Sequence, residues 1–180
     1  MNEITLFSSE KRDSDCTIVP LKIGSCNKGE KLFFTENVLC PLCKETGQHV
    51  KNITVKHLIK QELIDRIGAE DHFLCMNSIC DVAYYSAAGT VFKKWDIKVP
   101  LWFKDDAEPK YVCYCSEITE EQVIKAVIEQ DITDMVTIRQ LYDPGAKCQC
   151  HLKNPTGKCC SEVFSRAIDK GRTLKTTEKM

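Results

Sequence analysis

The sequence lacks the features of an exported, membrane-bound or nucleic-acid-binding protein. Residues 1–15 hold six charged side chains and no apolar run of signal-peptide length, and no later window approaches a membrane span. Lysine and arginine number 25 against 26 acidic residues, so the formal net charge is −1. This balance gives no basic footprint for nucleic acid. We therefore expect a cytoplasmic protein that binds neither membranes nor nucleic acid.

The marks of common enzyme classes are also missing. We find no glycine-rich loop that could cradle a phosphate and no distinctive serine or cysteine triad. The sequence therefore predicts a protein that is not an enzyme.

Cysteine is the residue type in excess. The chain has 12 cysteines in 180 residues, nearly 7%, well above ordinary usage. In a reducing compartment, clustered cysteines are more often metal ligands or redox groups than structural disulfides. Metal centres are therefore the favoured interpretation, and disulfides are the minor alternative.

The first group of cysteines has the spacing of a structural zinc site. Cys40-Pro-Leu-Cys43 is a knuckle in which proline stiffens the turn, and Cys75 and Cys80 follow after 31 residues. Two such pairs can complete a Cys₄ tetrahedron around zinc. The alternative is that these cysteines are ordinary core residues, which suits Cys75 beside Phe73 but not all four. Three histidines are conceivable further ligands, although four cysteines already fill the shell: His49, His57 and His72.

The second group favours an iron–sulfur cluster. Cys113-Tyr-Cys115 is separated by 32 residues from Cys148-Gln-Cys150, which Cys159-Cys160 then follows. Cysteines this close in sequence do not easily form an unstrained disulfide with each other, but they can direct thiolates at shared ions. The residues 154–157 (N-P-T-G) predict a type I turn that folds Cys160 back towards Cys150. The spacing alone leaves open which cysteines are ligands.

Helix signals accompany these cysteines. Thr119 to Gln122 reads as a capping box after Cys115, and a helix from Ser161, closed by Gly171, follows Cys160. We expect both helix N-termini to favour a negatively charged, thiolate-ligated group. Further helices are predicted over residues 54–67 and 131–142, and strands over residues 82–85 and 90–92.

The predicted fold class is α+β, with a small zinc-stapled sheet and helix followed by a small helical domain. The predicted divisions are an extension (1–37), a zinc-binding domain (38–107), a cluster domain (108–171) and a disordered tail (172–180), with the charged run 104–109 as linker. The extension holds a strand-like run, residues 17–23, between Cys16 and Cys26. These two are interpreted as ordinary thiols, with a dithiol for Cu(I) or a redox disulfide as the alternative.

Five motifs together carry a resemblance to a known family. They are C-P-x-C, F-L-C-M-N-S-I-C-D-V-A-Y-Y, T-V-F-K-K, V-C-Y-C-S-E-I-T-E-E and C-H-L-K-N-P-T-G-K-C-C. In order and spacing, from Val38 to about Gly171, they resemble the N-terminal region of CopZ-type copper chaperones. In that family a zinc-binding domain precedes a two-iron domain similar to bacterioferritin-associated ferredoxin (BFD).

The resemblance implies particular ligands. It implies that zinc is held by Cys40, Cys43, Cys75 and Cys80. It implies that a [2Fe-2S] cluster is held by Cys113, Cys115, Cys150 and Cys160, which selects Cys150 over Cys148 and Cys160 over Cys159. Members continue into a copper-binding domain with a C-x-x-C loop, and the present sequence is expected to lack that domain.

These expectations combine into a predicted function. The protein is expected to transfer single electrons, reducing Cu(II) to Cu(I) for a separate copper carrier. Its expected partners are a redox protein, that carrier or a copper ATPase system. Zinc and the cluster would take the net charge to roughly −5, which favours basic partners. The alternatives are a Cu(I)-trafficking or sensing module using Cys16, Cys26, Cys148 or Cys159, and an assembly subunit in which both metals only stabilise the fold.

Overall fold

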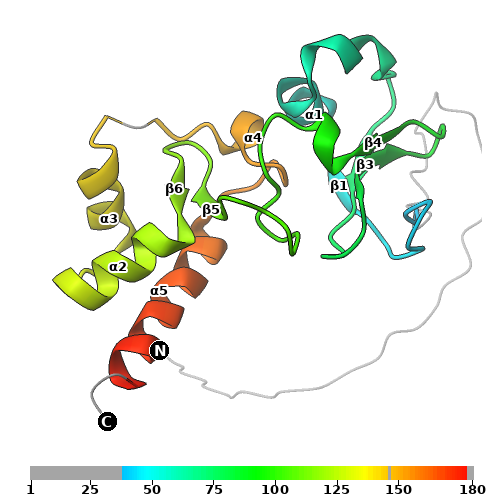
Figure 1. Ribbon diagram of the computed structural model, residues 1–180. Helices are drawn as coiled ribbons and strands as arrows, with labels where there is room; N and C mark the ends of the chain where they lie inside the picture. The colour runs from blue at the N-terminus through cyan, green and yellow to red at the C-terminus, as the bar shows by residue number, and fades with distance from the viewer. Residues whose placement is uncertain (1–37, 146, 178–180) are drawn as a thin grey trace, which may run out of the picture. The chain divides into compact units, whose positions relative to one another are not determined.

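The computed structural model describes residues 38–145 and 147–177 (Figure 1). The predicted strand at 17–23, Cys16 and Cys26 lie outside the described residues. The described part is α+β, as predicted: a four-stranded sheet with a helix is followed by a mainly helical region. None of the helices described there has the length and apolar character needed to cross a membrane.

An antiparallel sheet forms the first half. Its strands lie in chain order as β1 (Gln48–Val50), β2 (His72–Leu74), β3 (Val82–Ser86) and β4 (Val91–Lys93). The two strands predicted from the sequence correspond to β3 and β4, whereas β1 and β2 carry too little alternation to be recognised. All five residues of β3 are buried, because this strand is central to the sheet and packs on both faces.

The helix predicted over residues 54–67 is wrong in its second half. Helix α1 covers only Asn52–Leu58, and Ile59 is extended and forms an antiparallel bridge with Ile97. A 3₁₀ turn, η1, then covers Gln61–Arg66. Hydrogen bonding to a distant segment replaced the local helical bonds, a tertiary effect that overrides propensity. Of the six apolar residues at helical spacing, four are buried and two are half-buried: Val55, Leu58, Ile59 and Ile67 are buried, and Leu63 and Ile64 are half-buried.

The charged run predicted to be a linker is part of the first half. A second 3₁₀ turn, η2 (Lys94–Asp96), follows β4, and Leu101 joins the core under the sheet. Lys104 is 1% exposed, which no linker residue would be. The prediction of a linker at 104–109 is therefore wrong at its first residue.

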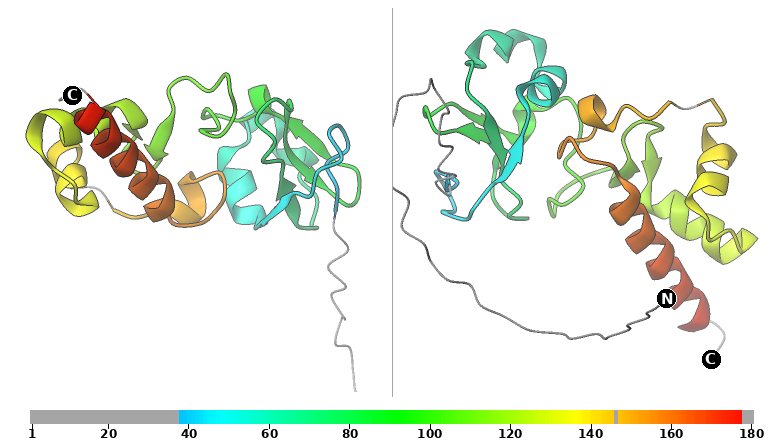
Figure 2. Two further views of the ribbon diagram at one scale, coloured as in Figure 1. Left: turned by 90° about the horizontal axis from the view of Figure 1, so that it is seen from below. Right: turned by 180° about the vertical axis from the view of Figure 1, so that it is seen from behind.

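The second half begins with a short hairpin and continues as four helices. Its elements are β5 (Tyr111–Cys113), β6 (Ile118–Thr119), α2 (Glu120–Gln130), α3 (Met135–Tyr142), α4 (Cys150–Lys153) and α5 (Ser161–Thr177). Helix α2 crosses α5, and α3 also contacts α5, an arrangement visible in both views of Figure 2. A core of apolar residues and cysteines fills the space between these elements.

Local signals placed the helix starts in this half well. Thr119 caps α2 and exchanges hydrogen bonds with Gln122, which confirms the predicted capping box. Helix α3 begins later than predicted, because the Asp134 carboxylate accepts the N–H of Thr137 and makes Asp134 the N-cap.

The predicted end of the last helix is wrong. Helix α5 continues through Gly171 to Thr177, so residues 172–177 are helical rather than a disordered tail. Gly171 is buried, and a Cβ added there would lie 2.9 Å from Val127 Cβ. The glycine therefore permits the close approach of α5 to α2 and does not end the helix.

Candidate metal centres

The first two cysteines are presented by a tight turn before β1. The Cys40 N–H donates to Glu45 O at 2.8 Å, and the Lys44 N–H donates to Cys40 O at 3.0 Å. Lys44 takes a positive φ of 63°, which closes the turn. These backbone bonds hold the thiols of Cys40 and Cys43 on the same side.

The second two cysteines flank the loop between β2 and β3. Cys75 directly follows β2, and Cys80 lies two residues before β3. The Asn77 side-chain oxygen accepts the N–H groups of Ile79 at 3.0 Å and Cys80 at 3.1 Å, which fixes the loop. Adjacent antiparallel strands therefore bring Cys75 and Cys80 together.

All four sulfur atoms meet at one point. The Cys40 and Cys80 sulfurs are 3.8 Å apart, the Cys43 and Cys75 sulfurs are 3.5 Å apart, and all four lie within 4.8 Å of one another. Ligands 2.3 Å from a tetrahedral zinc ion are separated by about 3.8 Å. The four cysteines predicted as zinc ligands thus have the separations of a closed Cys₄ zinc site.

The surroundings of this site suit a bound cation. Burial raises the pKa of Cys75 far above its ordinary value. Burial also opposes ionisation of Cys40, but N–H groups of Cys43 and Leu42 outweigh it and lower the pKa of Cys40. Because thiolates must form for zinc to bind, the ion supplies the charge that keeps all four deprotonated.

Lys104 supports the same loop with a buried ammonium group. Its Nζ donates to the carbonyl oxygens of Cys75 at 3.1 Å, Asn77 at 2.6 Å and Val82 at 3.1 Å. The three carbonyls use the three donors of the ammonium group. Sequence reasoning missed this residue, because nothing in its local pattern indicates carbonyls 22 to 29 positions earlier.

The predicted histidine alternatives are engaged elsewhere. His49 Nε2 contacts Asp71 Oδ2 at 2.8 Å, and His72 Nδ1 shares a hydrogen bond of 2.8 Å with Asn52 Oδ1. His57 lies in the last turn of α1. The group that converges on one point within the described residues contains cysteines alone.

The second group of cysteines forms two pairs rather than one tetrahedron. Cys113 and Cys160 are 1% and 3% exposed, and their side chains lie close enough to interact. The sulfurs of Cys115 and Cys150 are 3.7 Å apart, and both residues are half-buried. One pair is therefore enclosed, and the other lies closer to solvent.

Four different elements supply these pairs. Cys113 ends β5, Cys115 lies in the hairpin turn, Cys150 begins α4, and Cys160 precedes α5. Cys160 O accepts the N–H of Phe164 at 2.9 Å, so Cys160 is the N-cap of α5, as expected. The matching expectation for Cys115 is wrong, because β6 separates it from α2. The Gln149 N–H, 3.2 Å from Cys115 Sγ, supplies a donor there instead.

The enclosed pair is strongly coupled. The interaction with Cys160 lowers the pKa of Cys113 to about 5, and the same interaction raises the pKa of Cys160 well above its ordinary value. Burial raises the pKa of Cys115 to about 11. One thiolate therefore forms readily, and full ionisation of the group requires compensating positive charge.

The predicted turn at residues 154–157 brings the last cysteines back. The Gly157 N–H donates to Asn154 O at 2.8 Å, and Asn154 Oδ1 accepts from the Thr156 N–H at 3.1 Å. Gly157 has a φ of +67°. In addition, the buried Tyr84 hydroxyl donates to Pro155 O at 2.7 Å, which ties this turn to the sheet.

Cys148 and Cys159 differ from the four predicted cluster ligands in exposure. Both are exposed. Cys148 Sγ accepts a hydrogen bond of 3.1 Å from Arg139 Nη1, and the Cys159 side chain lies close enough to Cys150 to interact with it. The choice of Cys150 and Cys160 as ligands stays a prediction, and the contacts show that Cys159 lies beside the exposed pair.

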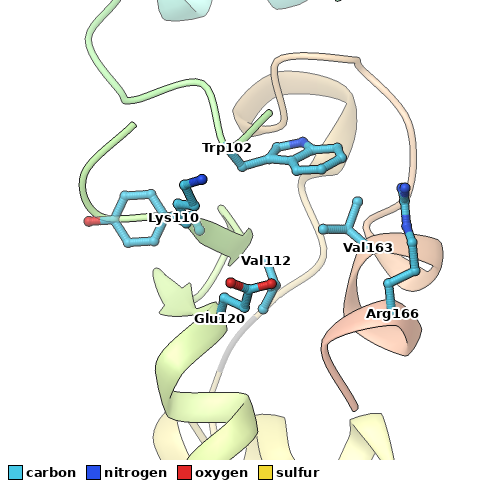
Figure 3. A pocket seen from close by; sticks show the side chains of 7 residues that line it. Trp102, Lys110, Val112, Glu120, Val163 and Arg166 are labelled. Carbon is cyan, nitrogen blue, oxygen red and sulfur yellow. The ribbon is translucent and has the colours of Figure 1, made fainter. Parts of the chain in front are cut away.

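A pocket of about 240 Å³ has in its lining Val112, which directly precedes Cys113, and Val163 of α5 (Figure 3). Trp102 covers one end, with Arg166 5.3 Å from its ring centroid. Glu120 lies between Lys110 and Arg166 in Figure 3, so the pocket carries both signs of charge.

Known proteins share this arrangement of sequence and fold. The CopZ family model described as "Zinc binding domain" matches residues 37–98. The copper chaperone CopZ of Archaeoglobus fulgidus is 33% identical over 121 residues, 67% of this chain and 57% of the relative. The X-ray structure of the A. fulgidus CopZ N-terminal domain superposes with a TM-score of 0.59 and 30% identity, covering 72% of this chain and 96% of that one. The chain belongs to the CopZ N-terminal-domain family.

Membership in the CopZ family defines what the first cysteine group is. Cys40, Cys43, Cys75 and Cys80 form the zinc site of a CopZ zinc-binding domain, and a further cysteine group follows it. The chain spans a little more than half the length of the copper chaperone that it matches.

Proposed function

We propose that this CopZ-related chain is an electron carrier rather than an enzyme. In this proposal zinc stabilises the first half, and Cys113, Cys115, Cys150 and Cys160 hold a [2Fe-2S] cluster in the second. The pairing of the cysteines carries the proposal. A two-iron cluster takes two terminal thiolates at each iron, and the four cysteines stand as two pairs.

The type of ligand atom also supports a [2Fe-2S] cluster. Four soft thiolates favour iron–sulfur clusters or zinc. A cluster held there would supply one-electron transfer, and the surrounding N–H groups would stabilise its negative charge. The Gln149 N–H lies 3.2 Å from the sulfur of Cys115, and Cys160 is the N-cap of the 17-residue helix α5.

The difference in exposure supports transfer at one edge. The Cys113 and Cys160 pair is almost inaccessible, whereas Cys115 and Cys150 are half-buried. An external partner would therefore approach the Cys115 and Cys150 side. In the proposed reaction Cu(II) gains one electron and becomes Cu(I) for a separate copper carrier, and a redox partner returns the electron.

Metal analysis with visible absorption and EPR of anaerobically purified protein tests the proposal. We expect one zinc and two irons per chain, together with a visible spectrum that reduction bleaches. Cys150→Ala should abolish the iron-dependent spectrum, and the matched variant Cys148→Ala should retain it. A folded, iron-free protein from oxygen-excluded cells would overturn the proposal.

The competing proposal is a Cu(I)-trafficking or sensing module. The exposure of Cys148 and Cys159 is the observation that favours it. A Cu(I) titration of the cluster-loaded protein separates the two functions. Stoichiometric tight binding that is lost in Cys148→Ala/Cys159→Ala, or when Cys16 and Cys26 are replaced, would support trafficking, and weak binding unaffected by these changes would support electron transfer.

A further inference from the structure

A second cavity, of about 210 Å³, lies beside the segment that links Cys150 to Cys159. Its lining combines the end of β1 and the start of α1 with the turn at residues 154–157. The polar side chains that matter for the argument are His49, Lys51, His151 and Lys158.

The cavity has a rigid frame. Thr54 Oγ1 donates to His151 O at 2.7 Å, and Gln48 Nε2 donates to Thr156 O at 3.3 Å. A Cβ at Gly157 would lie 3.1 Å from Thr54 Oγ1, so the turn approaches α1 closely. The lining residues on the two sides therefore keep their separation without a ligand.

The cavity adjoins the exposed edge of the proposed cluster site. His151 directly follows Cys150, and Lys158 directly precedes Cys159. The side chains of Cys159 and Cys150 in turn lie close enough to interact. A molecule held in the cavity would therefore lie beside the segments that carry Cys150 and Cys159.

The charge of the lining has one sign. Two lysines and two histidines line the cavity and no carboxylate does, in contrast to the pocket with Glu120 in Figure 3. The acidic group that faces this lining is Asp71, which is paired with His49. Residues 144–161 contain three lysines and no aspartate or glutamate. This local basic surface differs from the formal net charge of −1 of the whole chain.

We propose that this cavity is the docking site for acidic side chains of a protein electron-transfer partner. The proposal rests on the proposed function, because the cavity matters for electron transfer only if Cys115 and Cys150 hold a redox group. The negative net charge of the whole chain would favour basic partners, whereas the basic surface beside Cys115 and Cys150 selects acidic ones. Such local complementarity steers encounter and sets orientation.

The first experiment maps binding on the zinc- and iron-loaded full chain with hexacyanochromate(III), a redox-inert trianion that broadens nearby NMR signals. Broadening is expected at the amides of Lys51 and Gly157. Lys51→Glu/Lys158→Glu should remove it. Lys60→Glu/Lys125→Glu, with the same change in net charge at exposed sites, should not.

The second experiment measures the rate at which the reduced protein passes one electron to hexacyanoferrate(III). At about 0.01 M ionic strength the rate should fall about tenfold in Lys51→Glu/Lys158→Glu and less than twofold in the control. At 1 M salt the difference should vanish, because the Debye length is about 3 Å.

Three outcomes would overturn the docking site: equal slowing in both double variants, absence of broadening at Lys51 and Gly157, or tight stoichiometric displacement of the probe by inorganic phosphate. The last would assign the cavity to a small free anion. A protein without a reducible chromophore would refute the proposed function instead, and the NMR arm would still test whether the cavity selects anions.

Discussion

The two cysteine groups of this chain differ in how completely the fold encloses them. In the first half, four sulfurs meet within 4.8 Å, and three of the four residues are buried. In the second half, one pair is buried, the other is half-buried, and two further cysteines are exposed beside them. A closed site of this kind suits a structural ion, whereas a site with one accessible edge suits exchange with a partner.

The largest expected effect comes from breaking the closed site. Cys80→Ser should abolish zinc binding and lower the free energy of unfolding by more than about 5 kcal/mol, because a structural zinc ion contributes on the order of 10 kcal/mol. Zinc content and thermal unfolding measure this. Cys148→Ser, in the other group, is the control and should keep full zinc content; an equal loss in both variants would contradict the comparison.

Spacing and local turns account for what the sequence predicted well. The C-P-x-C knuckle and the N-P-T-G turn are each closed by hydrogen bonds within six residues, so their geometry follows from neighbouring residues. The capping box at Thr119 is equally local. For this reason the zinc quartet, and the two turns that bring cysteines together, could be predicted from sequence.

Long-range pairing accounts for what the sequence did not predict. Ile59 leaves the helix because it pairs with Ile97, and Lys104 is buried because carbonyls of the zinc loop accept its three donors. Gly171 resembles a helix stop, but the neighbouring helix requires its small size. In each case the deciding partner lies more than 20 residues away.

Lys104 offers a test of how far the closed site depends on its surroundings. Lys104→Met keeps the length of the side chain but removes the ammonium donor that three carbonyls share, so we expect a loss of about 3 kcal/mol in the free energy of unfolding. Zinc should also pass more rapidly to a chelator. Urea unfolding and zinc-transfer kinetics measure these effects.

The control for this change is Lys98→Met. Lys98 donates a single hydrogen bond of 2.8 Å, to His57 O, from an exposed position. Its loss should change stability by less than about 1 kcal/mol. If Lys98→Met and Lys104→Met had equal effects, the buried ammonium would have no special role at the zinc loop.

Tyr114 tests whether the second centre is tuned by the residue between its first two cysteines. Its hydroxyl donates to Pro100 O at 2.7 Å and accepts the Trp102 N–H at 3.0 Å, and burial raises its pKa above the ordinary range. Tyr114→Phe should therefore cost about 2 kcal/mol of stability. Because both hydroxyl contacts are made to residues 100–102, we expect only a small change in reduction potential.

Protein-film voltammetry together with urea unfolding separates these two effects. Tyr111→Phe is the matched control, because its ring lies 5.6 Å from that of Tyr114 and no hydroxyl contact ties it to residues 100–102. A large shift in potential with unchanged stability in Tyr114→Phe would show that the tyrosine tunes the centre directly, and that the hydroxyl contacts have another purpose.

The smallest expected effect concerns the helix pair that carries the second centre. Gly171→Ala gains roughly 1 kcal/mol of helix propensity, but the new methyl group would lie 2.9 Å from Val127 Cβ and would force α5 away from α2. We expect a net loss of about 1 kcal/mol in the free energy of unfolding, measured by urea unfolding.

Gly145→Ala, where the added Cβ meets no atom within 4 Å, is the control and should be close to neutral. Since Cys160 is the N-cap of α5, a displaced α5 should also broaden the EPR signal of the proposed cluster, whereas zinc content should stay unchanged. A stabilised Gly171→Ala variant would mean that α2 and α5 can separate without cost, and that the proposed metal centre holds the second half together more than this helix contact does.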